Sequence, residues 1–172
     1  MIQGINKRYL EYFVVAIVIA VLILTALNYY ILIAKDSAVL RLQIISQSFM
    51  TGAANARAAY FLRYTGKEAS AQDVYKLGDK ALYFSDQGWP VSTQPPSPLN
   101  HLTHQDCYEF WQIFLQNPEI ISSPSKELDD AAIQVFAFQS ACRYQLKTGD
   151  AWFEYYPWEG RLHFSSTSSS KF

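Results

Sequence analysis

Two cysteines are the residues of this sequence with the clearest chemical potential. Cys107 and Cys142 are its only cysteines, and both follow the long apolar segment near the N-terminus. In an oxidising compartment two such thiols pair, and closing a loop of this length stabilises a small domain by roughly 3–4 kcal/mol. The sequence therefore predicts a structural disulfide between Cys107 and Cys142.

The stretch HLTHQDC is a second candidate for chemistry, because His101, His104 and Cys107 recur at every third position with Asp106 beside the cysteine. This spacing matches zinc ligands only loosely, since established zinc sites bring a second ligand pair from elsewhere in the chain. A disulfide at Cys107 would also remove the best ligand. We therefore favour an ordinary solvated loop here over a metal site, and expect no cofactor.

The sequence contains no G-x-S-x-G motif, no P-loop and no glycine-rich nucleotide turn. One polar loop carries three acids, Glu127, Asp129 and Asp130, which are expected to be solvated rather than catalytic. The 14 Lys and Arg residues nearly balance the 15 Asp and Glu residues, so no net field attracts nucleic acid. We expect no enzymatic activity and no nucleic-acid partner.

The aromatic stretch AWFEYYPWEG has two interpretations. Alternate residues of a strand face outward, so Trp152, Tyr155 or Trp158 could form a platform for a carbohydrate or a partner protein. The favoured interpretation is that these rings belong to the core, with one tryptophan in a turn.

A long apolar run lies near the N-terminus, before the part of the chain that contains both cysteines. Residues 12–34 contain no ionisable acid or base, and about 23 residues at ~1.5 Å rise span ~34 Å, enough to cross a bilayer core. This run is longer than that of a cleaved signal peptide, and no convincing cleavage site follows it. We predict an uncleaved single span with boundary residues Lys7, Arg8, Glu11, Tyr29, Tyr30 and Lys35.

The orientation of this span follows mainly from the cysteines. Two basic residues lie on each side of the run, Lys7 and Arg8 before it and Lys35 and Arg41 after it. The positive-inside rule therefore gives only a slight preference for one orientation. A disulfide requires an oxidising compartment. We therefore expect a cytoplasmic N-terminus and a periplasmic domain.

Glu11 stands at the entry of the apolar run, in a segment, LEYFVVAIVIAVL, that is similar to the N-terminal helix of type IV pilins. In those proteins a glutamate is the fifth residue after the processed glycine. Counting back from Glu11 places the cut after Asn6, and a cut after Gly4 makes Tyr9 the fifth residue. Neither register gives the processing signature, so Glu11 is either an acid at a helix N-terminus, favoured there by the dipole, or part of an unprocessed pilin-like segment.

The segment after the span is expected to be an amphipathic helix ending near Gly66, continuous with the span. Its apolar residues recur every three or four positions: Leu42, Ile45, Phe49, Ala53, Ala56, Ala59 and Tyr60. The favoured interpretation is that this stripe covers a face of the chain's own sheet. The alternative is that it meets a partner helix.

Turn residues divide the remainder of the chain into short elements. DKALYFSDQGWPVST predicts a hairpin that turns at residues 86–88. THQDCYEFWQIFLQNP predicts a short helix with Thr103 as N-cap and Asp106 as its capping partner. Its docking face is expected to contain Cys107, Phe110, Trp111, Phe114 and Leu115. AIQVFAFQ, ACRYQL, AWFEYYP and RLHFSS predict an antiparallel meander, with a helix as the alternative for AIQVFAFQ.

Together these elements predict an α+β fold in which a long N-terminal helix precedes a small antiparallel sheet domain with one docked helix, pilin-like in outline. The expected divisions are a cytoplasmic N-terminus (1–11), a transmembrane helix (12–34), a stalk helix (35–66), a periplasmic domain (67–166) and a flexible tail (167–172).

In this order of elements the chain resembles the MshF family of mannose-sensitive haemagglutinin (MSHA) type IV pilus biogenesis proteins. The resemblance covers most of the chain and is carried by Gly88-Trp89, by Cys107 with Trp111 four residues later, and by Cys142 before a tyrosine-containing strand. It implies a bitopic inner-membrane protein of a pilus machine, pilin-like in shape and without an active site. Pilins and other pilus or secretion assembly proteins would be its partners, with homo- or hetero-oligomers formed through the stalk helix.

Two other functions stay open. A minor pilin or type II secretion pseudopilin subunit would require release from the anchor by a prepilin peptidase. The other is an extracytoplasmic ligand-binding sensor domain on a membrane anchor, although such sensors normally have a second membrane helix that returns to a cytoplasmic output domain.

Overall fold

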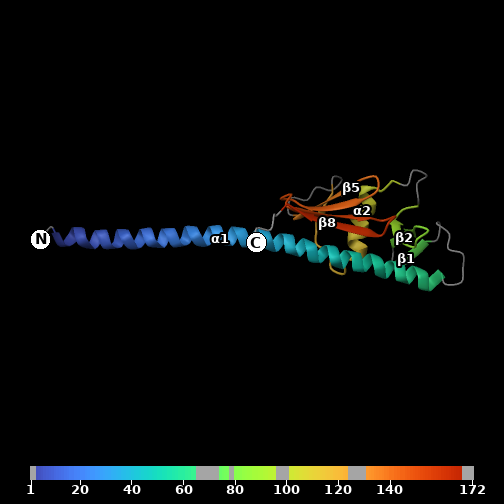
Figure 1. The fold of residues 1–172 in the computed structure, drawn as a ribbon, viewed down its shortest axis with the longest axis horizontal. Coiled ribbons are helices and arrows are strands. Elements are labelled where there is room, and N and C mark those ends of the chain that lie inside the picture. The colour runs from blue at the N-terminus through green and yellow to red at the C-terminus, as the bar shows by residue number, and fades with distance from the viewer. Residues whose placement is uncertain (1–2, 65–73, 78–79, 96–100, 124–130, 168–172) are drawn as a thin grey trace. The chain divides into compact units, whose positions relative to one another are not determined.

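The computed structural model describes residues 3–64, 74–77, 80–95, 101–123 and 131–167 (Figure 1). The helices and strands are α1 (Gln3–Tyr64), β1 (Val74–Leu77), β2 (Lys80–Phe84), β3 (Pro90–Ser92), α2 (His104–Phe114), β4 (Ile121–Ser122), β5 (Ile133–Ala137), β6 (Cys142–Leu146), β7 (Ala151–Tyr156) and β8 (Arg161–Ser166). The chain divides into two compact units, one ending at Ala38 and the other beginning at Val39. The predicted α+β class is confirmed.

The first unit is the N-terminal part of α1. Its stretch Tyr9–Tyr30 has a mean hydropathy of 2.7 and none of it is buried, so it is long and apolar enough to cross a membrane. The polar hydroxyl of Thr25 is satisfied inside the helix, where it donates to the carbonyl oxygens of Val21 and Leu22 at 3.1 and 2.9 Å. A polar group satisfied in this way does not need water, which suits a hydrocarbon environment.

The second unit contains a five-stranded sheet with the order β4-β5-β6-β7-β8. All neighbours are antiparallel except β4 and β5, which are parallel. Along β7 buried and half-buried residues alternate, so Phe153 and Tyr155 face the core while Trp152 and Glu154 face outward. The predicted meander is confirmed, and AIQVFAFQ forms a strand because it pairs in regular register with β6.

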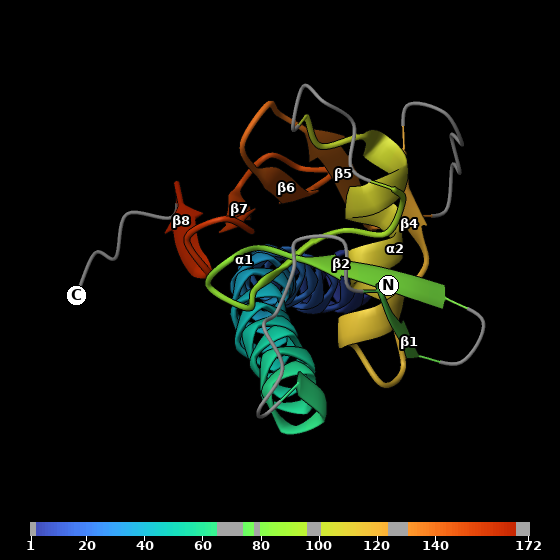
Figure 2. The same ribbon diagram turned by 90° about the vertical axis from the view of Figure 1, so that its right-hand side faces the viewer.

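Within the second unit, the α1 segment after Val39 and the helix α2 lie on the same side of this sheet (Figure 2). The buried stripe of α1 consists of the apolar residues Leu42, Phe49, Ala53 and Tyr60 together with Ser46. Phe49 meets the rings of Phe114, Tyr144, Phe153 and Tyr155 at centroid distances of 5.1, 5.2, 5.5 and 5.3 Å. The predicted amphipathic stripe therefore packs on the domain of its own chain.

The helix α2 is capped and docked as the sequence predicts. The Thr103 side chain accepts a hydrogen bond from the Asp106 N–H, and the Asp106 carboxylate accepts one from the Thr103 N–H. The buried face of α2 contains Cys107, Phe110, Trp111 and Phe114. Leu115, which was expected on this face, is instead the extended C-cap residue and is only half-buried, because the helix ends at Phe114.

The predicted disulfide is present and joins α2 to β6. Cys107 and Cys142 are both fully buried, and their Cα atoms lie 5.4 Å apart. The buried Tyr144 hydroxyl, two residues further along β6, donates to the Cys107 carbonyl oxygen at 2.7 Å. The covalent bond and this hydrogen bond hold α2 against the same strand.

The smaller sheet has the order β1-β2-β3 and contains the predicted hairpin, whose strands are β2 and β3. The Gly88 N–H donates to the Ser85 carbonyl oxygen at 2.8 Å, and Gly88 has a φ of 75°, a conformation that favours glycine. Tyr60 of α1 stacks on Phe84 of β2 at a centroid distance of 4.3 Å, which docks this hairpin on the helix.

Candidate functional site

The stretch HLTHQDC is a structural junction. The buried Asp106 carboxylate accepts hydrogen bonds from five donors at 2.6–3.0 Å. The donors are the hydroxyls of Ser92, Thr93 and Thr103 and the backbone N–H groups of Thr93 and Thr103. Asp106 thus joins the start of α2 to the end of β3, a long-range role that its place in the capping box does not predict.

The electrostatics of Asp106 follow from this geometry. Burial by itself raises the pKa of the carboxyl, but the hydrogen bonds from Thr103, Thr93 and Ser92 outweigh burial and lower the pKa below its ordinary value. A carboxyl with a depressed folded-state pKa stabilises the fold fully above its unfolded-state pKa of about 3.9. This contribution is lost as the pH falls through the lower, folded-state pKa.

Replacing Asp106 by asparagine is expected to lower the free energy of unfolding by about 2–3 kcal/mol at neutral pH, because the amide is a weaker acceptor and turns N–H donors toward other donors. The check is denaturant unfolding of the full chain in detergent, followed by tryptophan fluorescence. As the pH falls below the unfolded-state pKa of about 3.9, the difference from the natural chain should shrink. The matched control is Asp86→Asn in the exposed hairpin turn, which should change stability by less than about 0.5 kcal/mol.

The histidines of HLTHQDC do not form a metal site in the structure. Among the described residues no three His, Cys, Asp or Glu side chains lie close enough to hold a metal ion. His101 is exposed. The expectation of a solvated loop is wrong for His104, which is the first residue of α2 and accepts a hydrogen bond from the Ala137 N–H at 3.1 Å through Nδ1. His104 thereby binds the outward N–H of the last residue of β5.

The proposed aromatic platform divides between the two faces of the sheet. Tyr155 is fully buried and cannot belong to an exposed platform, because residue alternation places it on the core face. Burial raises the pKa of its hydroxyl, which faces the Pro90 carbonyl oxygen at 3.4 Å. Trp152 is half-buried on the outer face, and Trp158 is half-buried in the turn between β7 and β8.

The outer face of the sheet instead has an ion pair flanked by rings. Arg143 and Glu154 face each other across β6 and β7 with their nitrogen and oxygen atoms 2.6 Å apart. The Arg143 guanidinium lies 4.8 Å from the Phe138 ring centroid and 5.6 Å from that of Trp152. Burial by itself raises the pKa of the Glu154 carboxyl, but hydrogen bonds from Tyr156 and Arg143 lower it below its ordinary value. Arg143 and Glu154 bind each other and the neighbouring rings. This arrangement favours a role in stabilising the sheet over a role in binding a ligand.

The Gly88-Trp89 pair has a clear packing role. The Trp89 ring lies under the Arg57 guanidinium of α1, 4.5 Å from the ring centroid, and Arg57 Nε donates to the Gln87 carbonyl oxygen at 3.2 Å. On another side Trp89 contacts Gly160 so closely that a Cβ at Gly160 would fall 1.9 Å from the indole. Trp89 therefore connects the hairpin, α1 and the β7–β8 turn.

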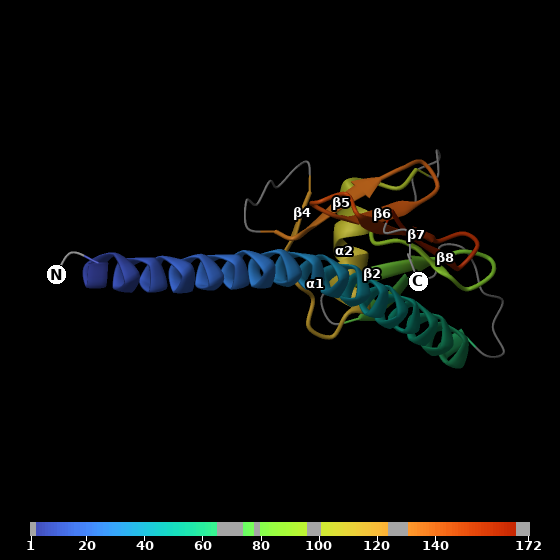
Figure 3. The ribbon, with the colours of Figure 1, turned by 60° about the vertical axis from the view of Figure 1, so that its left-hand side comes forward.

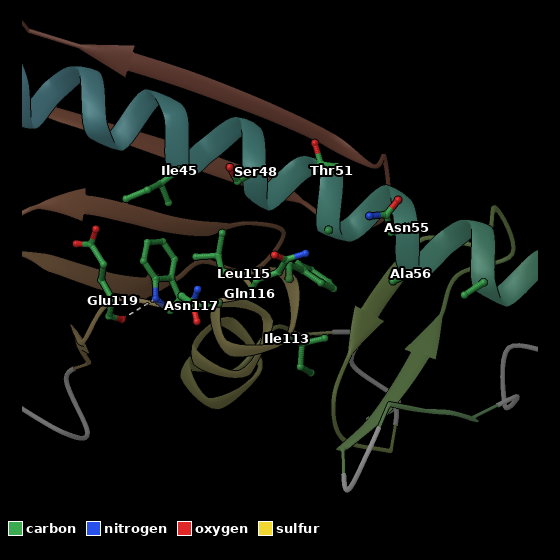
Figure 4. A pocket seen from close by; sticks show the side chains of 14 residues that line it. Ile45, Ser48, Thr51, Asn55, Ala56, Ile113, Leu115, Gln116, Asn117 and Glu119 are labelled. Atoms are coloured by element: carbon green, nitrogen blue, oxygen red, sulfur yellow. Dashed lines mark hydrogen bonds between the residues drawn. The ribbon is translucent and has the colours of Figure 1, made fainter.

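A groove of about 720 Å³ lies between α1 and the end of α2 in the second unit (Figure 4). Small and polar side chains of α1 line one wall, among them Ser48, Thr51 and Asn55. The other wall comes from the end of α2 and the segment after it, where the Trp111 indole N–H donates to the Glu119 carbonyl oxygen at 2.9 Å. The Glu119 carboxylate pairs with Arg41 at 2.6 Å, so this acid is not left free to bind a ligand.

Gly52 sits where α1 meets the end of α2, and no side chain fits there. A Cβ on Gly52 would lie 2.1 Å from the Phe114 carbonyl oxygen. Gly52→Ala is expected to lower the free energy of unfolding by about 1–3 kcal/mol despite the better helix propensity of alanine, because the two helices must move apart. The measurement is denaturant unfolding of the full chain in detergent.

The control for Gly52→Ala is Ala54→Gly at an exposed position of the same helix, which measures the propensity difference of about 1 kcal/mol alone. A Gly52→Ala chain more stable than the natural chain would contradict the close approach of α2 to α1.

The remaining predicted site residues have no common site. The residues predicted to mark the ends of the membrane span all lie on α1: Lys7, Arg8, Glu11, Tyr29, Tyr30 and Lys35. The three acids of the polar loop, Glu127, Asp129 and Asp130, lie outside the described residues. The best-formed features are therefore packing junctions, a groove and the open edge of the larger sheet.

Comparison of the chain with protein families, with curated proteins and with solved structures finds no match.

Proposed function

We propose that this protein is a non-enzymatic, membrane-anchored component of a type IV pilus biogenesis machine of the MSHA kind. In this role it acts through protein–protein contacts of its α+β domain. The single observation that carries the proposal is that α1 contains both the exposed apolar run Tyr9–Tyr30 and the buried stripe around Phe49. A helix that is apolar at its start and packs under an antiparallel sheet at its end suits the resemblance to pilin-like assembly proteins.

The compartment follows from the same proposal. The disulfide between Cys107 and Cys142 is compatible with an oxidising space, which in a bacterium is the periplasm. We infer an inner-membrane anchor with a cytoplasmic N-terminus and a periplasmic domain. In the periplasm the domain would contact pilin subunits and other assembly proteins.

The test of this function is deletion of the gene in the bacterium that encodes the chain, with the amount of assembled surface fibre as the readout. We expect fibre to be lost or strongly reduced, and to return when the full chain is supplied. Normal fibre assembly after deletion would overturn the proposal.

A pilin or pseudopilin subunit is the second candidate, favoured by Glu11 on α1 just ahead of the apolar residues. The deciding measurement is the mass of the chain extracted from native membranes, before and after reduction and thiol alkylation. An intact chain with two thiols exposed only on reduction supports a fixed assembly component. Loss of the first few residues would make the protein a processed subunit.

A ligand-binding domain is the third candidate, favoured by the groove between α1 and α2. Substituting Asn55→Leu would fill part of this groove on the α1 side. A change in fibre assembly caused by Asn55→Leu, with stability unchanged, would favour a ligand in the groove, whereas unchanged assembly would exclude the groove from the function.

A further inference from the structure

The strand β8 is the last strand of the five-stranded sheet, and no other described strand pairs with its outer side (Figure 3). It pairs with β7 over its full six residues, and the register is regular from Tyr156↔Arg161 to Ala151↔Ser166. An edge strand of this kind presents a row of backbone N–H and C=O groups to any chain that approaches in an extended conformation.

The register shows which backbone groups of β8 are directed outward. The Thr167 N–H donates to the Asp150 carbonyl oxygen at 2.8 Å, so these two residues are a hydrogen-bonded pair. Hydrogen-bonded and non-hydrogen-bonded pairs alternate in an antiparallel ladder. The backbone groups that bond to β7 therefore belong to Arg161, His163 and Ser165. Those of Leu162, Phe164 and Ser166 are directed outward, and no residue in the described part of the chain is seen to bond to them.

The other described edges are short or covered. The edge strand β4 has two residues, and the edge of β5 next to it ends where His104 accepts the Ala137 N–H. The edge strand β3 has three residues and begins with Pro90. The edge strand β1 has four residues. Proline, bulges, shortness and charged side chains are the usual means of protecting an edge, and β8 shows only the last of these, in Arg161 at its first position.

The side chains of β8 also leave the core incomplete at this edge. Leu162 and Phe164 lie opposite Tyr155 and Phe153 on the core face of the sheet. Tyr155 and Phe153 are fully buried, whereas Leu162 and Phe164 are only partly buried. An added strand with apolar side chains at alternate positions would cover Leu162 and Phe164 while its backbone bonds to the outward groups.

We propose that β8 accepts an extended segment of a different protein, with apolar residues at alternate positions, as an additional strand of the sheet. This inference rests on the proposed assembly function, since it names the surface through which the domain meets a partner. The backbone groups of Leu162, Phe164 and Ser166 supply the binding, and the half-covered side chains of Leu162 and Phe164 supply the selection for apolar residues.

The geometry argues against a second copy of this chain as the occupant. Within the second unit β8 runs opposite to the α1 segment that begins at Val39 (Figure 4). Antiparallel pairing of two β8 strands would direct the Val39 ends of the two segments to opposite sides of the joined sheet. Two chains that are anchored through those ends in one membrane cannot adopt that arrangement readily, whereas a separate protein can.

The test places the photo-crosslinker p-benzoylphenylalanine at His163, an exposed side chain of β8, in the full chain in fibre-forming cells. The matched control position is Gln145 on the outer face in the middle of the sheet. We expect a cross-link from His163 to one different protein and about tenfold less from Gln145. No cross-link from His163, or equal cross-links from both positions, would overturn the proposal, and so would a cross-link to a second copy of this chain.

An edge-blocking variant sharpens this result. Ser166→Pro removes an outward N–H without removing a hydrogen bond to β7, and Ser166→Ala is the control that keeps this N–H. Ser166→Pro should reduce the cross-link from His163 by about tenfold with the far-ultraviolet circular dichroism and the disulfide unchanged, and Ser166→Ala should not. An undiminished cross-link in a folded Ser166→Pro chain would contradict the strand-addition model.

A second measurement does not depend on proline. Cysteines are introduced one at a time along the cross-linked segment of the partner and tested for disulfide formation with a chain carrying Ser166→Cys. Bonding at every second position indicates an added strand, whereas contiguous or three-to-four-residue spacing would exclude one. Fibre assembly separates the two proposals: a Ser166→Pro chain that restores fibre fully refutes the edge role alone, while normal fibre in the deletion strain refutes the assembly function.

Discussion

Phe49→Ala is expected to lower the free energy of unfolding of the domain by about 3–5 kcal/mol, the largest effect that we predict for a single substitution. Phe49 is fully buried, and its ring contacts one aromatic residue of α2 and three of the sheet. Removing it leaves a cavity at the place where helix and sheet meet, and it also removes edge-to-face ring contacts. Denaturant unfolding of the full chain in detergent, followed by tryptophan fluorescence, measures the loss.

The control for Phe49→Ala is Leu62→Ala on the same helix. Leu62 is 81% exposed, so its truncation should change stability by less than about 0.5 kcal/mol. If the two substitutions cost the same, α1 does not pack on the sheet through Phe49. The tryptophans all follow the apolar run, so their fluorescence reports on the domain rather than on the anchor.

Removing the disulfide by Cys107→Ala together with Cys142→Ala is expected to lower the free energy of unfolding by roughly 3–4 kcal/mol. The bond closes a loop with a sequence separation of 35 residues and connects α2 to the middle of the sheet. Without it the unfolded chain gains conformational freedom, while the buried apolar contacts of α2 remain. The readout is the unfolding midpoint of the full chain in detergent, compared with that of the natural chain.

Reduction of the natural chain provides the control for the cysteine variant. Because both sulfur atoms are buried, a reducing agent should act slowly on the folded protein and quickly once denaturant is added. After reduction the natural chain should unfold at the same denaturant concentration as the double alanine variant. A variant as stable as the oxidised natural chain would show that the bond contributes little to the fold.

Local signals in the sequence were sufficient for most of the elements. Thr103 and Asp106 stand three residues apart before an apolar face, and this pattern contains the whole capping box of α2. Gly149 and Gly160 adopt positive φ values in the turns between the last strands, where glycine is favoured. These features depend on residues that are close in sequence, so their structure can be predicted without knowledge of the fold.

Other features depend on residues far apart and could not be predicted. The strand β4 has two residues and exists only because β5 pairs with it in parallel, and β1 likewise depends on β2. In AWFEYYP both sets of alternate residues contain rings, so the pattern does not show which face is buried, and Tyr155 was wrongly considered for the surface. The hydrogen bonds from Ser92 and Thr93 to Asp106 join residues that are 14 and 13 positions apart in sequence, and no spacing rule predicts such pairs.

The position of Phe49 in the sequence also determines how late in synthesis the core of the domain can form. Its partners Tyr144, Phe153 and Tyr155 are made about a hundred residues later, so the ring leaves the ribosome with no surface to cover it. At synthesis rates of about 5–20 residues per second, this delay lasts roughly 5–20 seconds. Through that interval Phe49 and the rest of the buried stripe of α1 are exposed in the nascent chain, so the domain cannot fold completely until the last hairpin has been synthesised.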